Sequence, residues 1–419
     1  MSLPKILCLA ALVLLCGPAS AAKFKTLYAF CPEENCLDGK WPQGSLAMDS
    51  AGNLYGTTYN GGAGLQGVVF QLRPNAKRTK WRYRTIYTFC AHDASCRTGG
   101  LPEGRLIVDA AGNVYGTAQS GGHSGVRGGV AYELMPSDTG KKWKLKVLYS
   151  FGSHSGDGTQ PLGGLTYSGA ASGAVYDGIS PLYGMTHAGG GADDGTAYAL
   201  DPPASGGGDW SMRVLHSFCS ATDCADGYFP NAGLTMDGSG NLFGVAGAGL
   251  FRLSPDGTQT ILYTFCSEGE CPDGSDPQGA LTLDDAGNLY GTTRAGGQGF
   301  NSNAGVAFKL APDGANWTYS VIHDFCSQRD CVDGMVPSSG LTRDSRGNLY
   351  GVTRDCLISP CYGTLYRIGA TFSVLHTFTG DDGAQPIDNV IRDAGGSLYG
   401  VTMMGGAFSD AGTVYELRR

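Results

Sequence analysis

The sequence predicts an all-β protein, a seven-bladed β-propeller of four-stranded antiparallel blades. Three observations support this prediction. One sequence phrase recurs seven times, each copy offers four short runs of β-forming residues without helical periodicity, and the start of the chain supplies a strand that is missing at its end.

The recurring phrase is built on an aromatic residue followed by glycine, as in DSAGNLYGTTYNGG from Asp49 to Gly62. Successive copies are 60, 68, 60, 47, 60 and 49 residues apart, so the intervening loops differ in length. The aromatic residues of the seven copies are Tyr55, Tyr115, Tyr183, Phe243, Tyr290, Tyr350 and Tyr399.

Each copy contains four β-type runs, here called strands A to D in chain order. In the first copy they are residues 44–49, 53–58, 68–72 and 83–89. We expect a short A–B turn from Asp49 to Asn53, in which the Asp49 carboxylate accepts hydrogen bonds from turn amides and Gly52 has a positive φ. These A–B turns are expected to be short in every copy, whereas the B–C and D–A loops vary.

The two ends of the chain predict how the ring closes. A D-type strand, Phe24 to Phe30, precedes any A strand, and the chain finishes with a C-type strand, Thr413 to Leu417. We therefore expect the N-terminal strand to complete the last blade, which hides the edges that a linear stack would expose. An open solenoid is the alternative, but it needs distinct polar capping repeats.

Residues 1–22 have the features of a secretory signal peptide: an early lysine, an apolar run of about a dozen residues, and an A-x-A arrangement at Ala19 and Ala21. We expect residues 23–419 to form one propeller domain, and the protein to be secreted to the periplasm or outside the cell. No later segment has the ~20 apolar residues of a membrane span, so we expect no membrane insertion.

The charge of the chain argues against one class of partner. The net charge is −8, and it becomes −9 when Lys5 leaves with the signal peptide. Because nucleic-acid phosphates need clustered lysine and arginine, this mildly acidic chain is expected to have no nucleic-acid partner. We expect a monomer without a cofactor.

The cysteines agree with export. Fourteen cysteines less Cys8 and Cys16 of the signal peptide leave twelve, and all twelve fall into close pairs. Disulfide bonds are expected, because zinc would need two pairs brought together and each pair belongs to a different repeat. The expected pairs are Cys31 with Cys36, Cys90 with Cys96, Cys219 with Cys224, Cys266 with Cys271, Cys326 with Cys331, and Cys356 with Cys361.

The units GNLYGTT…GG, preceded by LYxFC and DGxxPxG, resemble the GloVer-type (Gloeo_Verruco) tandem repeat of secreted bacterial proteins. The resemblance covers nearly all of the chain after the signal peptide. It implies an extracellular protein with β-propeller-like repeats, and it supplies no catalytic residue.

One position in each copy combines a fixed place with mixed chemistry. It lies four residues after the aromatic residue of strand B, and the copies have Tyr59, Gln119, His187, Gly247, Arg294, Arg354 and Met403 there. In a propeller the B–C and D–A loops emerge on one face, so these residues are expected at the rim of a binding face. A solvated rim without a ligand is the alternative.

Aromatic residues of the D–A loops are a second group of candidates. Trp41 lies in DGKWPQG, and Tyr228 and Phe229 take its place in DGYFPNAG. An exposed ring beside proline can stack on a sugar or on a partner's side chain, although it can also simply cover the blade. The tryptophans that begin strand D are instead expected to pack between blades; they are Trp81, Trp143, Trp210 and Trp317.

An Asp-Gly pair recurs in six D–A loops, at Asp38, Asp157, Asp226, Asp273, Asp333 and Asp382. A turn is the expected role, because aspartate bonds to its own backbone and glycine adopts a left-handed angle. Calcium binding by this ring of carboxylates is the alternative. Three histidines, His216, His323 and His376, replace the tyrosine of LYxF in strand D and are expected to be structural.

Together these features predict a non-enzymatic extracellular binding module that uses the D–A and B–C loop face, with a glycan or a protein surface as partner. The candidate ligand-binding residues are Trp41, Tyr59, His187, Tyr228, Phe229, Arg294 and Arg354. No pattern indicates a catalytic residue or a metal site. The alternative is a hydrolase or lyase at the central channel, with His187 as base and Arg294 or Arg354 holding an anionic substrate.

Overall fold

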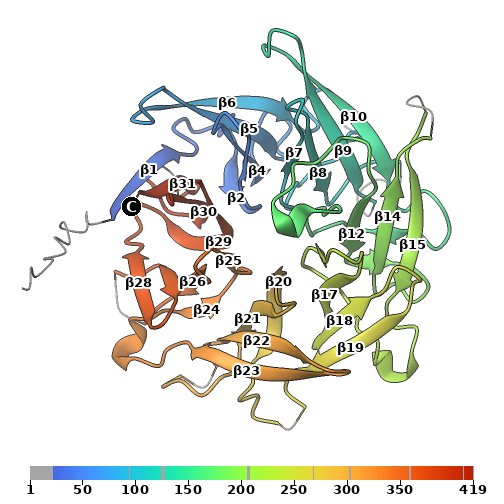
Figure 1. Cartoon of the computed structure of the whole chain (residues 1–419). Helices are drawn as coiled ribbons and strands as arrows, with labels where there is room; N and C mark the ends of the chain where they lie inside the picture. Colours follow the sequence, from blue (N-terminus) through green and yellow to red (C-terminus); the bar gives the residue numbers. More distant parts are fainter. Residues whose placement is uncertain are drawn as a thin grey trace, which may run out of the picture.

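The computed structural model shows seven β-sheet blades arranged round a central axis (Figure 1), so the predicted seven-bladed β-propeller is confirmed. It describes residues 22–93, 95–123, 128–204, 208–267, 269–301, 303–357, 360–408 and 410–418. The predicted signal peptide therefore lies almost entirely outside the described residues. Within the described part of the chain, helical structure is limited to three 3₁₀ turns, and none could span a bilayer.

The first four blades follow one another along the chain. Blade 1 has β2 (Lys40–Pro42), β3 (Ala47–Met48), β4 (Leu54–Asn60), β5 (Val68–Pro74) and β6 (Trp81–Thr88). Blade 2 has β7 (Ile107–Val108), β8 (Val114–Ala118), β9 (Val130–Pro136) and β10 (Trp143–Ser150). Blade 3 has β11 (Gly158–Thr159), η2 (Ala170–Ser172), β12 (Leu182–Thr186), β13 (Ala188–Gly189), β14 (Thr196–Asp201) and β15 (Ser211–Ser217). Blade 4 has η3 (Thr222–Cys224), β16 (Thr235–Met236), β17 (Leu242–Ala246), β18 (Gly249–Leu253) and β19 (Gln259–Thr264).

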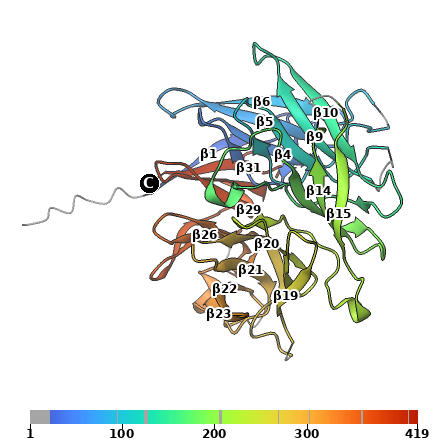
Figure 2. The same cartoon turned by 45° about the vertical axis from the view of Figure 1, so that its right-hand side comes forward.

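The last three blades complete the arrangement. Blade 5 has β20 (Ser275–Leu283), β21 (Leu289–Ala295), β22 (Val306–Asp313) and β23 (Asn316–Asp324). Blade 6 has η4 (Arg329–Cys331), β24 (Met335–Pro337), β25 (Thr342–Arg343), β26 (Leu349–Asp355), β27 (Thr364–Ile368) and β28 (Phe372–Thr377). Blade 7 has β29 (Ala384–Arg392), β30 (Leu398–Met404) and β31 (Thr413–Arg418), with β1 (Lys23–Ala29) paired antiparallel to β31. Figures 1 and 2 show β1, in blue, beside the red β31.

The sheets do not all have the four strands that the sequence predicted. In blades 1 and 6 strand A is split into two short pieces, and in blade 3 the pair β11–β13 is separate from the three-stranded sheet β12–β14–β15. At the break in blade 1, part of the strand A backbone bonds to the neighbouring blade. In blade 1 the Ser45 N–H donates to Asp388 Oδ2 of blade 7 at 2.7 Å and leaves no bond for strand B.

The predicted A–B turn is confirmed in blade 1. Asp49 Oδ1 accepts from the N–H groups of Ala51 and Asn53, its Oδ2 accepts from the Tyr55 hydroxyl at 3.0 Å, and Gly52 has a φ of 79°. The turn is not short in every copy, however. In blade 3 the connection before β12 contains η2 and Tyr176, whose buried ring packs edge-on against Tyr115 of blade 2.

The glycine of the recurring phrase is required by close packing. A Cβ on Gly56 would lie 2.5 Å from the Phe70 ring of the next strand, a distance that real side chains do not reach. The aromatic residue of strand C lies across this glycine in the other blades too, as Tyr366 does at Gly351. The aromatic-Gly pair therefore recurs because the ring of strand C crosses strand B at that point.

The hydrophobic core lies between blades. Among the described residues, seven clusters of buried side chains are present, and each draws its members from two neighbouring blades. Three strand D tryptophans contact the strand B aromatic residue of the preceding blade; the ring pairs are Trp81–Tyr399, Trp143–Tyr55 and Trp317–Phe243. Their predicted role in packing between blades is confirmed.

A side-chain pair fastens each D–A loop to the end of strand D. In the first loop the Tyr28 hydroxyl donates to Asp38 Oδ2 at 2.7 Å, and the Cys31 N–H donates to the same carboxylate at 3.1 Å. Five further pairs repeat this bond: Tyr149–Asp157, His216–Asp226, Tyr263–Asp273, His323–Asp333 and His376–Asp382. The loop without this aspartate has Thr98, which accepts from the Tyr87 hydroxyl. The turn role of the aspartates and the structural role of the three histidines follow from these contacts.

The predicted disulfide bonds close the same loops. All six expected cysteine pairs are bonded, so this prediction is confirmed. Five of the bonds lie in D–A loops, and they join Cys31 to Cys36, Cys90 to Cys96, Cys219 to Cys224, Cys266 to Cys271 and Cys326 to Cys331. The sixth joins Cys356 to Cys361 in the B–C loop of blade 6. Each bond spans only five or six residues, so it stiffens one loop and does not connect blades.

Asp333 is the most enclosed of the D–A loop aspartates, with a fully buried side chain. Burial alone would raise its pKa, but hydrogen bonds from His323 and Ser327 outweigh that effect and hold the pKa below the ordinary 3.8. Because the folded-state pKa is lowered, the ionised carboxylate contributes stability that is fully present above pH 3.8 and is lost as the pH falls through the folded-state pKa.

We predict that Asp333→Asn lowers the free energy of unfolding by roughly 1–3 kcal/mol near neutral pH, because the amide cannot accept all of these bonds. The difference between wild type and variant should shrink as the pH falls below about 4, and denaturant unfolding at several pH values measures it. Asp381→Asn, at an exposed position in the D–A loop of the next repeat, is the control. A difference that stays constant down to the lowest pH would contradict the role given to the ionised carboxylate.

Candidate binding site

Seven residues that precede a proline lie where the D–A loops enter strand A. They are Trp41, Leu101, Gln160, Phe229, Asp276, Val336 and Gln385, and all have φ between 43° and 58°. This left-handed conformation is unusual before proline, which favours extended backbone. Hydrogen bonds to the preceding blade help to hold it: the Trp41 N–H donates to the Ala411 carbonyl and the Phe229 N–H to the Asp194 carbonyl, both at 2.9 Å. Each loop thus connects two blades.

The residues at the end of strand B meet these loops. His187 stacks on Phe229 of the next blade, with 5.2 Å between ring centroids and 28° between planes. Arg354 donates to Gln385 Oε1 at 3.0 Å, and an Arg294 nitrogen lies 3.9 Å from the Asp276 carboxylate. These rim residues differ in chemistry, and each meets a different partner in the D–A loop of the next blade.

A hollow of about 360 Å³ lies on this face, where blades 3, 4 and 5 meet. Its lining residues are His187, Tyr228, Phe229, Asn231, Val245, Gly247, Ala248, Asp276 and Pro277. They come from the B–C loop of blade 3, the D–A loop, strand β17 and B–C turn of blade 4, and the start of strand A in blade 5. The hollow thus collects variable loop positions from three repeats.

The hollow forms because blade 4 has the shortest B–C connection among the described blades. Only Gly247 and Ala248 join β17 to β18, whereas residues 61–67 join β4 to β5 in blade 1. The Tyr228 ring occupies the space that a longer loop would fill. A Cβ on Gly247 would lie 2.7 Å from this ring. Glycine at this position therefore lets Tyr228 form the floor of the hollow.

Two exposed aromatic rings form the apolar part of the site. Tyr228 and Phe229 keep 43% and 46% of their surface exposed, which is unusual for side chains of this size. Their centroids are 5.9 Å apart and the rings are perpendicular, while Phe229 also stacks on His187. The backbone N–H of His187 donates to the Gln160 carbonyl at 2.9 Å, and its ring Nδ1 is buried without a hydrogen-bond partner.

The loop that presents these rings is braced. The Cys219–Cys224 disulfide closes its first turn, and the Cys219 N–H donates to the Gly227 carbonyl at 2.9 Å. The Asp226 carboxylate accepts from His216 and from Ser220. Burial would raise the pKa of Asp226, but hydrogen bonds from Ser220 and from the Ala221 N–H outweigh that effect and lower it. The backbone that leads into the ring pair is therefore braced by the loop itself.

Polar groups belong to the same lining as the rings. Asn231 is exposed, and the Asp276 side chain is half exposed. Asp276 Oδ1 accepts from Gln278 Nε2 at 2.8 Å, and its other oxygen lies near Arg294. An amide and a carboxylate in one hollow with aromatic rings can combine stacking with hydrogen bonding to one ligand.

The hollow brings together three of the seven candidate residues that the sequence suggested, His187, Tyr228 and Phe229. Arg294 is not in the lining, but it lies next to Asp276, which is. The other three lie elsewhere on the rim. Trp41 in blade 1 carries the Lys40 ammonium 4.5 Å from its ring centroid, and Tyr59 and Arg354 belong to blades 1 and 6.

Sequence reasoning missed Asn231 and Asp276. The signal was present, because Asp276 precedes Pro277 at the same repeat position as Trp41 and Phe229. The spacing of 47 residues from Phe243 to the next copy is the shortest of the six, and it also indicated that blade 4 has a shortened connection.

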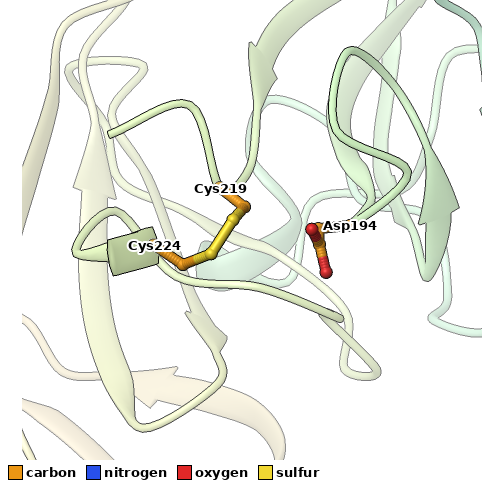
Figure 3. A group of neighbouring side chains, drawn as sticks. All are labelled: Asp194, Cys219 and Cys224. Atoms are coloured by element: carbon orange, nitrogen blue, oxygen red, sulfur yellow. A yellow bond between two sulfur atoms is a disulfide. The ribbon is translucent and has the colours of Figure 1, made fainter. Parts of the chain in front are cut away.

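One group of possible metal ligands lies close to this loop. Figure 3 shows Asp194 beside Cys219 and Cys224, the one such cluster found within the described ranges. The two sulfur atoms are bonded to each other, so neither is a thiolate that could bind a metal ion. The cluster therefore offers a single carboxylate, and the Asp194 backbone instead holds Phe229.

The chain resembles several solved propellers at low identity. The extracellular domain of a protein described as a one-component system of B. thetaiotaomicron is 13% identical, with a TM-score of 0.49, and the match covers 91% of this chain and 40% of that chain. A protein of Thermus thermophilus described as an oxidoreductase (glucose dehydrogenase) is 14% identical, with a TM-score of 0.42, covering 95% and 100%. A gluconolactonase of Xanthomonas campestris is 12% identical, with a TM-score of 0.39, covering 95% and 89%. No curated protein matches the sequence.

A family model described as the Gloeobacter/Verrucomicrobia repeat matches residues 17–180 and 169–358. The two matches together cover most of the chain, and they include the aromatic-Gly phrase in six of its seven copies. The repeat resemblance seen in the sequence is thereby confirmed. The chain belongs to the family of the Gloeobacter/Verrucomicrobia repeat.

Proposed function

We propose that this protein is an exported binding module that holds a glycan in the hollow between blades 3, 4 and 5. The observation that carries the proposal is the exposed ring pair, Tyr228 and Phe229, which a disulfide-braced loop presents beside Asn231 and Asp276. Sugar rings offer apolar C–H faces and hydroxyl groups at their edges, so they match an aromatic surface flanked by an amide and a carboxylate.

Export supports the choice of an extracellular ligand. Signal-peptide features in residues 1–22 and six disulfides favour an oxidising compartment, and residues 23–419 then form the propeller domain. The volume of about 360 Å³ is near the lower end of ligand pockets, which range from about 300 to 1,000 Å³. A short glycan segment, one ring of which rests on the aromatic pair, suits this size.

Phe229→Ala should weaken glycan binding about tenfold, because it removes one of the two aromatic stacking surfaces and the ring that lies between His187 and the ligand. The measurement is titration calorimetry against a panel of soluble polysaccharides: xylan, mixed-linkage glucan, polygalacturonate and alginate. Thermal unfolding should show that the variant remains folded, since the ring is exposed.

Leu101→Ala is the matched control, because Leu101 occupies the same pre-proline position in blade 2 and lies outside the hollow. Trp41→Ala tests whether the binding surface extends to blade 1, as the sequence suggested. A panel without any binding would remove the proposal. An equal loss of affinity in Leu101→Ala and Phe229→Ala would show that the glycan does not bind in the hollow.

A hydrolase or lyase is the second candidate, favoured by one observation. His187 lines the hollow, and its Nδ1 is buried without a hydrogen-bond partner. The arginines suggested to hold an anionic substrate fit this role less well. Arg294 lies beside the Asp276 carboxylate, and Arg354 is bound to Gln385 in another blade pair. For these reasons we propose binding ahead of catalysis.

We predict no turnover when the protein is incubated with lactone, ester and uronate substrates and the products are measured by chromatography. Gln119→Ala is the control for His187→Ala, because the two residues occupy the same position in neighbouring blades. Turnover that His187→Ala abolishes and Gln119→Ala retains would replace the binding proposal with an enzyme.

A binding rim assembled from three blades needs a rigid ring, and we propose that β1 closes it. The pairing of β1 with β31 joins the two ends of the chain in one sheet. Phe24 stacks on His376 with 3.6 Å between ring centroids, and Phe30 is fully buried in the cluster shared by blades 7 and 1. These contacts tie β1 to blades 6, 7 and 1.

A chain that begins at Asp38 should be insoluble or markedly less stable than one that begins at Lys23. Without β1, the strand Thr413–Arg418 has an unpaired edge, and edges rich in β-branched and aromatic residues promote aggregation. Size-exclusion chromatography and thermal unfolding compare the two chains. A soluble monomer that begins at Asp38 and melts at the same temperature would show that closure by β1 is not needed.

A further inference from the structure

A second hollow, of about 320 Å³, lies on the opposite face of the propeller, where the A–B turns of blades 6 and 7 meet. Its lining residues are Asp344, Ser345, Arg346, Asn348, Arg367, Arg392, Gly395 and Gly396. Three of them are arginines, on a chain whose net charge is −8. The hollow is therefore a positively charged site on a negatively charged protein.

The three arginines come from three different places in the repeat. Arg346 lies in the A–B turn of blade 6, Arg367 in β27, and Arg392 at the end of β29 in blade 7. Arg367 faces Tyr350 across the ladder, at the position where blade 2 has Glu133 facing Tyr115. In blade 2 the tyrosine hydroxyl donates to that glutamate at 3.0 Å. The blades differ in charge at this position: blades 2 and 7 have glutamate, blades 4, 5 and 6 have a cation, and the cation of blade 6, Arg367, lines this hollow.

None of the three side chains forms an ion pair or a hydrogen bond with the residues that the structure describes. Arginines elsewhere do, as Arg78 does with Asp393 at 2.8 Å. The Nε of Arg367 is buried without a partner, and a buried donor left unbonded is destabilising. A ligand that accepts a hydrogen bond from this Nε removes the cost of leaving the donor unbonded.

The one carboxylate in the wall is already engaged. Asp344 Oδ1 accepts from the backbone N–H groups of Arg346 and Asn348, and Oδ2 accepts from Asn348 Nδ2. These bonds outweigh the effect of burial and lower the pKa of Asp344, so it stays ionised at neutral pH. Three guanidinium charges and one carboxylate leave two positive charges in the hollow.

We propose that this hollow binds a dianionic tetrahedral oxyanion, as inorganic phosphate or as the phosphate group of a monoester. The charge of such a group matches the two uncompensated positive charges. Guanidinium groups bind phosphate oxygens through paired N–H donors, and the Ser345 hydroxyl lies in the same lining as a further donor. The site is independent of the glycan site, because it lies on the other face of the ring.

The test is titration calorimetry of the full mature chain with sodium phosphate at about pH 8, where phosphate is a dianion. Sodium chloride of equal ionic strength provides the background. We expect one phosphate per chain. Arg367→Gln and Arg392→Gln should each weaken binding about tenfold, since each removes charge-assisted hydrogen bonds. Sulfate should bind comparably, and acetate, which is planar and carries one charge, should bind much more weakly.

Arg252→Gln is the matched control. Arg252 faces Phe243 in blade 4 at the position of Arg367, and its Nε is also buried without a partner, but it does not line the hollow. This variant should bind phosphate like the wild type. Should Arg367→Gln fail to fold, Arg346→Gln and Arg392→Gln, both at exposed positions, carry the same test.

A sugar monophosphate distinguishes the two sources of the group. Binding as tight as that of inorganic phosphate, or tighter, shows that the hollow accepts a monoester, and binding of inorganic phosphate alone restricts the ligand to the free anion. Absence of phosphate binding would overturn the proposal. An equal loss of affinity in Arg252→Gln and Arg392→Gln would also overturn it, because binding would then reflect general charge.

Discussion

The structure depends on the packing of one blade against the next. Each sheet has apolar side chains on both faces, and these are buried only between its two neighbours, as Phe89 of blade 1 is against Tyr132 of blade 2 with 5.4 Å between ring centroids. No blade has a core of its own among the described residues. The recurring aromatic-Gly phrase serves this packing, because its glycine lets the strand C ring cross strand B and reach the neighbouring sheet.

Because the core lies between the sheets, the loops at the rim are free to differ. Most D–A loops are nevertheless held at two points, by an aspartate bonded to strand D and by a left-handed residue bonded to the preceding blade. A change in one loop therefore alters the rim locally without disturbing the blades. The two-residue B–C turn of blade 4 is such a change, and the hollow beside Phe229 is its result.

Most of the fold could be predicted from the sequence, because each blade repeats the same local requirements. The Asp49 turn and the six cysteine pairs are set by residues close together in one repeat, and the packing tryptophans recur at one place in the repeat, although their partners lie in the preceding blade. The split of strand A and the long insertion before β12 could not be predicted, since Ser45 and Tyr176 take their partners from other blades. The hollow depends in the same way on Asp276, which reaches it only when the ring is assembled.

The two hollows arise by different physical routes. On the loop face, a shortened connection removes backbone, and the neighbouring Tyr228 and Phe229 are left exposed in one lining with polar groups. On the turn face the blade 6 and blade 7 turns keep their length, and the hollow is distinguished by its charge, because Arg367, whose place is fixed by the ladder, lines it together with Arg346 and Arg392. A repeat that fixes its backbone through inter-blade packing can therefore vary its chemistry at single positions. The seven copies of one phrase provide the scaffold, and the places where a copy departs from the phrase carry the candidate sites.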